Sequence, residues 1–209
     1  MRPIRRIVLG PGSSEIVMAR RRLVFPLVIL GLLCAASSAA AQTAQPAGSD
    51  VQRQRIEALD ELDGEWRGTA TTTMPGHTTV LTQTERVGSL LGGSVKLIEG
   101  RGYAADGSTQ FNAFAILSWD ERAGRYSFRS YANGYTGEYP FERTEDGFRW
   151  EMPAGPNAKI RYVAVIRDGT WHEVGDYVAE GQPPRRFIEL RLTRVGDTDW
   201  PGEGAVSPQ

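Results

Sequence analysis

Hydrophobic and polar residues alternate along the chain with two different periods, and the change between them falls near residue 63. Ile56, Leu59 and Leu62 recur at helical spacing, which predicts one short helix over residues 49–62. From residue 65 onward the period is two residues, and turn residues recur about every ten positions, as in barrels and sandwiches. The pattern predicts about ten strands, at residues 65–74, 78–88, 93–103, 109–119, 125–132, 136–143, 147–152, 158–167, 170–179 and 185–195.

The connections between the predicted strands are short, and this decides the topology. They contain Asp-Gly and Gly-Gly pairs, which accept the positive φ of tight hairpins, and no stretch long enough for a crossover helix. Strands linked by hairpins close into a barrel because closure removes exposed edges. We therefore predict an all-β fold, a single antiparallel up-and-down barrel of about ten strands, with the short N-terminal helix over one mouth.

The chain before the predicted helix has the pattern of an export signal. Three arginines at 20–22 precede an apolar run at 23–34, and residues 39–41 provide a small-residue cleavage site. The apolar run is too short to span a bilayer as a mature helix. The predicted divisions of the chain are 1–17, an upstream extension added by mis-annotation; 18–41, a signal peptide cleaved near Ala41; 42–48, a flexible lead-in; 49–195, the helix and barrel; and 196–209, a disordered tail.

The predicted localisation is therefore periplasmic or secreted. A lipoprotein signal is the alternative, because Cys34 ends the apolar run, but Leu33 stands where lipoprotein cleavage requires a small residue. Removal of residues 1–41 changes the formal net charge from −1 to −6 and takes away the single cysteine. A negative chain is a poor partner for nucleic acid, and no later segment has the apolar length of an integral membrane span.

Gly64 and Trp66 stand at the head of the first predicted strand, within the sequence GEWRG. A glycine two places before a tryptophan at this position resembles the calycin superfamily of ligand-binding barrels. Lipocalin-like barrels place a basic side chain of the last strand over that tryptophan. Arg194 lies on the same face of the last strand as Leu190 and Leu192. The resemblance implies that Arg194 closes the barrel through a cation–π contact with Trp66. The alternative is that Arg194 is hydrated.

The stretch from about Leu62 to Val195 resembles the exported bacterial lipocalin-like barrels that are classed only as a domain of unknown function. The shared features are LDGEWRG at the first strand, FAILSWDERAGRY through the central hairpin and DGTWHEVGDY near the end. A second, weaker resemblance is to the nitrobindins, which are ten-stranded haem barrels whose first strand begins G-x-W-x-G. The chain departs from the nitrobindin motif at residues 69–75, which read TATTTMP.

The nitrobindin resemblance raises the question of a haem ligand. A haem iron needs an axial ligand, most often histidine, and the chain offers His77 in a hairpin loop and His172 in a late strand. His172 is the candidate that the resemblance implies, and an ordinary strand histidine is the alternative. The two histidines lie too far apart in the sequence to show the spacing of a metal site, so we predict no metal ligand and no required cofactor.

Aromatic residues occur on nearly every predicted strand. Small barrels enclose either packed side chains or one modest ligand cavity. With the face of Tyr126 and Phe128 turned inward, the candidate ligand-binding residues are Tyr126, Phe128, Trp150, Tyr162 and Tyr177. The alternative is that these rings fill the barrel.

Motifs of known enzyme classes do not occur in the sequence, and we predict no catalytic residue. Carboxylates from different strands could still meet inside a barrel. Two buried carboxylates that lie close together have different pKa values, so one can act as an acid and the other as a base. The candidates are Glu138, Glu151, Glu173 and Glu189, although surface salt bridges are the commoner fate of such residues. A cofactor-free hydrolase or isomerase is therefore a minor alternative.

The predicted function is non-catalytic binding of a small apolar or amphipathic molecule by an exported barrel. One alternative is a nitrobindin-like haem barrel that uses His172, and another is a structural or interaction module with a filled core. Arg129 and Tyr131 belong to a segment with large rings on both faces, which favours a partner protein or a homodimer on the outer wall.

Overall fold

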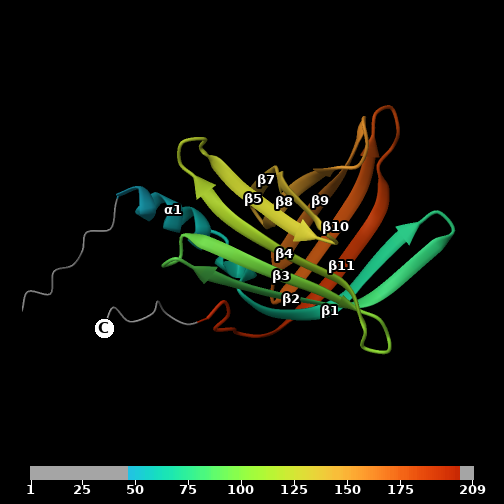
Figure 1. Ribbon diagram of the computed structural model, residues 1–209, viewed down its shortest axis with the longest axis horizontal. Coiled ribbons are helices and arrows are strands. Elements are labelled where there is room, and N and C mark those ends of the chain that lie inside the picture. The colour runs from blue at the N-terminus through green and yellow to red at the C-terminus, as the bar shows by residue number, and fades with distance from the viewer. Residues whose placement is uncertain (1–46, 203–209) are drawn as a thin grey trace, which may run out of the picture. The chain divides into compact units, whose positions relative to one another are not determined.

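The structure is a computed structural model that describes residues 47–202, all within one compact unit of the chain (Figure 1). The predicted upstream extension and signal peptide, and the predicted lead-in up to residue 46, lie outside the described residues. The elements in chain order are α1 (Ala47–Glu57), the 3₁₀ helix η1 (Asp60–Leu62), β1 (Gly64–Met74), β2 (His77–Leu90), β3 (Val95–Tyr103), β4 (Thr109–Asp120), β5 (Arg125–Ala132), β6 (Tyr135–Tyr139), β7 (Phe141–Thr144), β8 (Gly147–Pro153), β9 (Ala158–Arg167), β10 (Thr170–Ala179) and β11 (Arg185–Gly196).

All strands belong to one antiparallel sheet of eleven strands, which curves into a nearly closed barrel. The order is β6-β5-β4-β3-β2-β1-β11-β10-β9-β8-β7, so neighbours in the sheet are neighbours in sequence except where β1 meets β11. That single long-range pairing, which includes Trp66 opposite Arg194, joins the two ends of the strand series. The prediction of an all-β antiparallel up-and-down barrel with a short N-terminal helix is confirmed.

The sixth predicted strand, residues 136–143, is divided by Pro140 into β6 and β7. β6 pairs with β5, where Tyr139 lies opposite Phe128, whereas β7 pairs with β8, where Phe141 lies opposite Trp150. Proline has no N–H to donate to a neighbouring strand, so regular pairing stops at this residue. Its carbonyl oxygen still accepts a hydrogen bond from the N–H of Glu151 at 3.2 Å. The kinked segment thus bridges the two edges of the sheet, and the strand count is eleven instead of ten.

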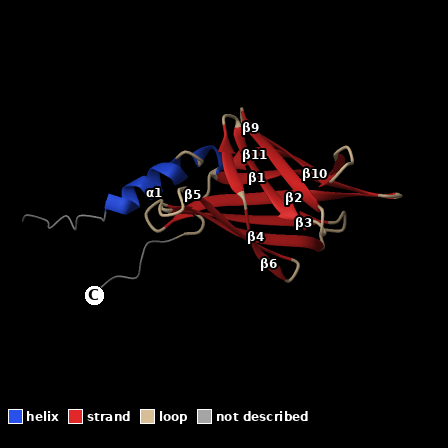
Figure 2. Ribbon diagram, turned by 90° about the horizontal axis from the view of Figure 1, so that it is seen from above, coloured by secondary structure: helices blue, strands red, loops and turns tan. Residues whose placement is uncertain are grey.

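The helical segment covers one end of the barrel (Figures 1 and 2). The predicted single helix is two pieces, α1 and η1, and Ile56, Leu59 and Leu62 are fully buried against the strands. Tyr126 donates its hydroxyl hydrogen to the carbonyl oxygen of Arg55 at 2.8 Å, which ties α1 to β5. We call this the closed end, and the opposite end, with the β8–β9 and β10–β11 loops, the open end.

A buried ion pair fixes the turn before β1 to the barrel wall. The Lys96 side chain is fully buried, and its ammonium group lies 2.9 Å from Asp60 Oδ1 and 2.5 Å from Asp63 Oδ1. Burial raises the pKa of Asp63, and the neighbouring Lys96 opposes that shift. The closed end therefore contains a buried cation that is compensated by two carboxylates.

The segment after β11 differs from the prediction of a disordered tail over residues 196–202. Gly196 is still part of β11, and the Trp200 ring packs edge-to-face on Phe114 at 6.4 Å between ring centroids. The Arg86 guanidinium lies 4.6 Å from the centre of the same ring. The contacts of Trp200 with Phe114 and Arg86 therefore hold this part of the tail on the outer wall. The Gly/Pro-rich composition of the tail gives no sign of these contacts.

Within residues 47–202, neither helix combines the length and the apolar character that a transmembrane helix requires.

Candidate functional site

The three predicted closure residues meet at the closed end, but their chemistry differs from the prediction. Gly64 has φ 121°, and a Cβ built there would lie 2.7 Å from the Arg194 guanidinium. Arg194 donates two hydrogen bonds to the carbonyl oxygen of Asp63, at 3.1 and 3.0 Å. None of the cation–π contacts in the described part of the chain joins Arg194 to Trp66. The guanidinium instead satisfies a backbone acceptor at the start of β1, so the predicted cation–π closure is wrong.

Trp66 is the central side chain of this end. It is 1% exposed, and its indole N–H donates to the carbonyl oxygen of Leu62 at 2.8 Å. The ring packs edge-to-face on Trp171, with 5.7 Å between centroids. Trp171 in turn packs edge-to-face on Phe148 at 5.7 Å. This chain of rings fills the closed end with a solid core.

The predicted ligand-binding residues all lie on the face that points into the barrel, and three of them are in contact. Cross-strand pairing places Trp150 beside Tyr162, and their rings stack at 3.9 Å with 3° between their planes. Phe128 meets Trp150 from the facing strands at 5.3 Å. Tyr126 belongs to the core under α1, whereas Tyr177 lies near the open end. The structure therefore brings Phe128, Trp150 and Tyr162 together and separates the other two.

The exposure of inward-facing side chains changes along the barrel. At the closed end they are buried, as Trp66, Val87 and Leu117 show. Toward the open end a few inward-facing residues such as Ile160 and Gln83 are buried, but many are only half-buried. The half-buried ones are Leu81, Phe111, Ser130, Tyr139, Met152, Tyr162, Tyr177 and Ile188. An inward-facing side chain can keep solvent contact only where the interior is not filled. We call this set the open half of the interior.

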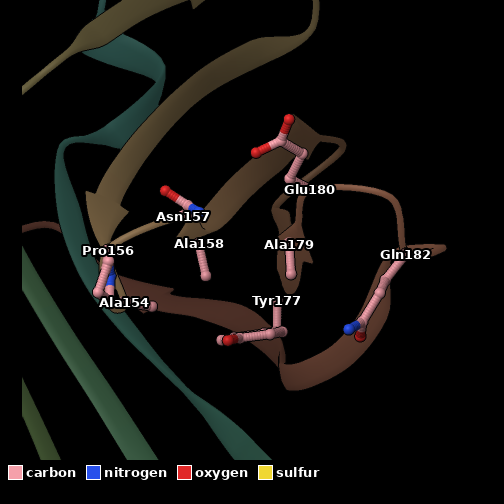
Figure 3. Close-up of a pocket in the computed structure, with 9 residues that line it drawn as sticks. Ala154, Pro156, Asn157, Ala158, Tyr177, Ala179, Glu180 and Gln182 are labelled. Atoms are coloured by element: carbon pink, nitrogen blue, oxygen red, sulfur yellow. The ribbon is translucent and has the colours of Figure 1, made fainter.

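A hollow of about 430 Å³ lies at the open end (Figure 3). Its walls come from the β8–β9 loop, the adjoining ends of β9 and β10, and the β10–β11 loop. Tyr177 lines it from β10, and Ala158 lines it from β9. Tyr177 is therefore the one predicted ligand-binding residue that lines this hollow.

Small residues on one wall make room for larger inward-facing side chains, since a Cβ built on Gly137 would lie 2.5 Å from the Tyr139 hydroxyl oxygen. Gly100, Ala113, Ser130 and Gly137 occupy inward positions on β3, β4, β5 and β6, whereas large rings occupy the inward positions of β8 and β9. A Cβ built on Gly100 would lie 2.8 Å from both carboxylate oxygens of Glu85. The glycine therefore leaves the room that the Glu85 carboxylate occupies.

Two buried carboxylates face the interior at the floor of the open half. Glu173, a candidate from the sequence, is 6% exposed, and its two oxygens accept the indole N–H groups of Trp150 and Trp171 at 3.0 and 3.1 Å. Glu85 is 9% exposed, and its Oε1 accepts the side-chain amide of Gln83 at 2.7 Å. Sequence reasoning missed Glu85 and Gln83, which lie in a polar run that reads as a solvent-facing strand.

Burial raises the pKa values of the acidic side chains in the open half. It raises the pKa of Glu85 to about 8, and the nearby Glu173 adds to the shift while the Gln83 hydrogen bond opposes it. Burial also raises the pKa of Glu173, against the effect of its two indole donors. The pKa of the Tyr162 hydroxyl is raised by burial and by the charge of Glu173. The open half thus has an aromatic wall above two carboxyl groups that resist ionisation.

The other predicted glutamates lie outside the barrel. Glu138, Glu151 and Glu189 form salt bridges with arginine or lysine side chains on the outer wall. Hydrogen bonds from Lys159 and Arg161 lower the pKa of Glu151, and the hydrogen bond with His172, with the charge of Arg191, lowers the pKa of Glu189. The predicted meeting of these three carboxylates inside the barrel does not occur, and of the four candidates Glu173 alone faces inward.

His172 points away from the interior. It lies between the inward-facing Trp171 and Glu173, and its Nε2 is 2.7 Å from Glu189 Oε1 on the outer wall. His77 is exposed at the start of β2, where its ring hydrogen-bonds to Thr79. The structure therefore brings neither histidine to the aromatic wall. Among the described residues, no group of three His, Cys, Asp or Glu side chains is placed to hold a metal ion.

The predicted partner surface is exposed. Tyr131 is 40% exposed on the outer face of β5, and the Arg129 guanidinium lies 5.7 Å from its ring centre. A homodimer through this surface remains a prediction.

The fold is a nearly closed antiparallel β-barrel with aromatic side chains in its interior. Among solved structures, the chain is similar to Rv2717c from M. tuberculosis, a calycin/nitrobindin-like β-barrel, with a TM-score of 0.51 and 17% sequence identity. The match covers 66% of this chain and 96% of Rv2717c. No protein-family model and no curated protein matches the chain. At this identity the likeness shows the shared fold alone.

Proposed function

We propose that the protein is a non-catalytic binding protein that takes a small, flat, apolar or amphipathic molecule into the open half of its barrel. The observation that carries this proposal is the incomplete burial of rings toward the open end, where the inward-facing Phe111, Tyr139, Tyr162 and Tyr177 are all half-buried. The stacked rings of Trp150 and Tyr162 offer an apolar surface there, and Phe128 and Tyr139 contact Trp150 from β5 and β6. Cavities with aromatic walls and few polar groups are the usual form of small-molecule sites.

We further propose that this binding takes place after export, in the periplasm or outside the cell. The support comes from the arginines and apolar run of residues 20–34 and the cleavage pattern that ends at Ala41. Intact-mass measurement of the protein recovered from the periplasm tests this point. A mass that begins at Gln42 is expected, and an unprocessed chain retained in the cytoplasm would contradict it.

A dye titration tests the binding site. Nile red, a flat uncharged dye, should bind the purified protein saturably at about one molecule per chain, with a rise in its fluorescence. Ala113 faces inward, between Gly100 and Ala132, so Ala113→Phe fills the open half and should weaken dye binding about tenfold or more. Asn112 is the exposed neighbour on the same strand, and Asn112→Phe is the matched control that should bind like the wild type.

A second variant keeps the test decisive if Ala113→Phe unfolds the barrel. Tyr162→Ala removes one ring of the stacked pair and should lower dye affinity while circular dichroism shows an intact sheet. Absence of saturable binding by the wild type would refute the proposed function. Equal binding by the wild type and both inward variants would place the dye on the outer wall and refute the site.

A further inference from the structure

We infer that the ligand of the open half is a small organic cation, a protonated amine or amidine carried on an aromatic or apolar body. This inference rests on the proposed function and names the chemical class of its ligand. The cationic N–H groups would meet the carboxylate of Glu85, and the apolar body would lie on the rings of Trp150 and Tyr162.

The first support is the absence of a cation where two carboxyl groups are buried. In the described part of the chain, no lysine, arginine or histidine forms a hydrogen bond or salt bridge with Glu85 or Glu173. Buried carboxylates are normally paired with a cation, because an unpaired buried charge is costly. The same barrel follows that rule at its closed end, where Lys96 meets two carboxylates.

The second support is an unused acceptor. Glu85 Oε1 accepts the amide of Gln83, whereas Glu85 Oε2 accepts no hydrogen bond from the described residues. The side chain is 9% exposed, so bulk water reaches it poorly. Among the buried side-chain polar atoms of the described residues, the one without a hydrogen-bond partner is Arg86 Nε, so Glu85 Oε2 keeps contact with solvent and its acceptor position is open to a donor. A ligand N–H donor that enters from the open end would occupy that position.

The third support is the aromatic wall beside the carboxyl groups. Trp150 stacks on Tyr162 and also donates its indole N–H to Glu173, so one side chain joins the wall to the acidic floor. Aromatic faces attract ammonium and guanidinium groups, most strongly where water is excluded. At the rim the chain already uses its aromatic side chains in this way, since the exposed Arg185 guanidinium lies 5.5 Å from the centre of the Tyr177 ring.

The acidity of Glu85 gives the inference a measurable signature. The groups that act on it are Gln83 and Glu99 from β2 and β3 and Glu173 from β10, and none of them is a cation. With its pKa raised to about 8, the Glu85 carboxyl is largely protonated near neutral pH. A cation bound beside it favours the ionised form, so binding expels a proton. An uncharged ligand leaves the proton in place.

Isothermal titration calorimetry with three matched indoles tests the inference. Tryptamine, tryptophol and indole-3-propionate share a ring and differ in an ammonium, a hydroxyl and a carboxylate group. We expect tryptamine to bind about tenfold or more tightly than tryptophol, and indole-3-propionate to bind most weakly. Glu85→Gln should bring the tryptamine-to-tryptophol ratio close to one. Glu138→Gln, on the outer face of β6 and absent from the groups that act on Glu85, is the control that should keep the ratio.

Titrations near neutral pH in buffers of different ionisation enthalpy count the protons released. Tryptamine should release about one proton in the wild type and almost none in Glu85→Gln, and tryptophol should release none in either protein. Glu173→Gln keeps a side-chain oxygen that can accept a hydrogen bond from an indole N–H. This variant is a second test, and it should also bind tryptamine more weakly than the wild type.

The outcomes separate this inference from the proposed function. Tryptophol binding as tightly as tryptamine, or a ratio unchanged in Glu85→Gln, overturns the cation inference while Nile red binding leaves the barrel a binding protein. Failure of all three indoles with intact Nile red binding overturns it in the same way. Failure of the indoles and of Nile red together removes the proposed function, and the inference with it.

Discussion

The two ends of the barrel interior treat buried charge in opposite ways. At the closed end Lys96 is fully buried and its ammonium group meets Asp60 and Asp63. At the floor of the open half Glu85 and Glu173 are also buried, but their hydrogen-bond donors are one amide and two indoles. The carboxylates of the closed end come from η1 and the turn before β1, whereas those of the open half come from β2 and β10.

The contrast teaches which end is built for stability. A compensated ion pair beneath a packed helix holds the fold together, whereas uncompensated carboxyl groups lower stability unless they stay protonated. Perturbed acidity in a partly open, aromatic cavity is a common property of functional sites. The comparison predicts that substitutions at the closed end destabilise the protein and that removal of the open-end acid stabilises it.

The largest expected effect is at the closed end. Trp66→Ala removes a ring that is 1% exposed, packs on Trp171 and donates to the Leu62 carbonyl, so it should lower the free energy of unfolding by about 3–5 kcal/mol. Tyr177→Ala, at the half-buried open end, should cost only about 1 kcal/mol. Urea denaturation of both variants measures the difference. Equal losses would mean that the two ends are packed alike.

The next effect has the opposite sign. The pKa of Glu85 lies at about 8 in the folded chain and near 4.5 when the side chain is free, so its contribution to stability is complete below about pH 4.5 and is lost as the pH rises through 8. That loss is on the order of 3 kcal/mol between about pH 5 and pH 8. Glu85→Gln should escape it and become the more stable protein at the higher pH.

Urea denaturation of the wild type and Glu85→Gln across this pH range checks the sign. The difference between the two proteins matters, because Glu99 and Glu151 have lowered pKa values and contribute in the opposite direction in both. A difference that does not change with pH would show that Glu85 ionises normally and would break the contrast between the ends.

The smallest effect concerns the compensated cation. Lys96→Met should lower the free energy of unfolding by about 1–3 kcal/mol, less than for a fully enclosed pair, because Asp60 and Asp63 keep partial contact with water. Lys159→Met removes an ammonium group that is paired with Glu151 on the outer wall, and it should cost less than about 1 kcal/mol. Thermal unfolding of the two methionine variants compares them. A stabilising Lys96→Met would show that the closed end gains nothing from its ion pair.

Much of the architecture could be predicted from local patterns, and the errors have local causes. Asp-Gly and Gly-Gly turns placed the hairpins, and the switch of period near residue 63 separated the helix from the strands. Pro140 was included in one strand, although its missing N–H divides that strand and lets it bridge the sheet edges. Trp200 lies in a Gly/Pro-rich tail, and its packing on Phe114 depends on a partner some eighty-six positions earlier in the sequence.

The candidate site was predictable only in part. The aromatic residues were found because the face of Phe128 was taken as inward. In the structure Phe128 pairs with Leu117 of β4 and Tyr139 of β6, so these two residues also point inward. Glu85 was not found, since nothing in its polar surroundings marks it as buried. Its inward position follows from its pairing with Trp66 and Gly100, which lie on two different strands.

The sequence by itself determined the period of each segment, the positions of the turns and the distribution of aromatic residues over the strands, because these can be read from neighbours in the chain. The tertiary structure alone decided which face of each strand points inward. Alternation is symmetric: shifting the inward face by one residue exchanges His172 for Glu173 without changing the pattern. Only the closure of β1 on β11 and the pairing of successive strands break that symmetry, and they turn Glu85 and Glu173 inward and His172 outward.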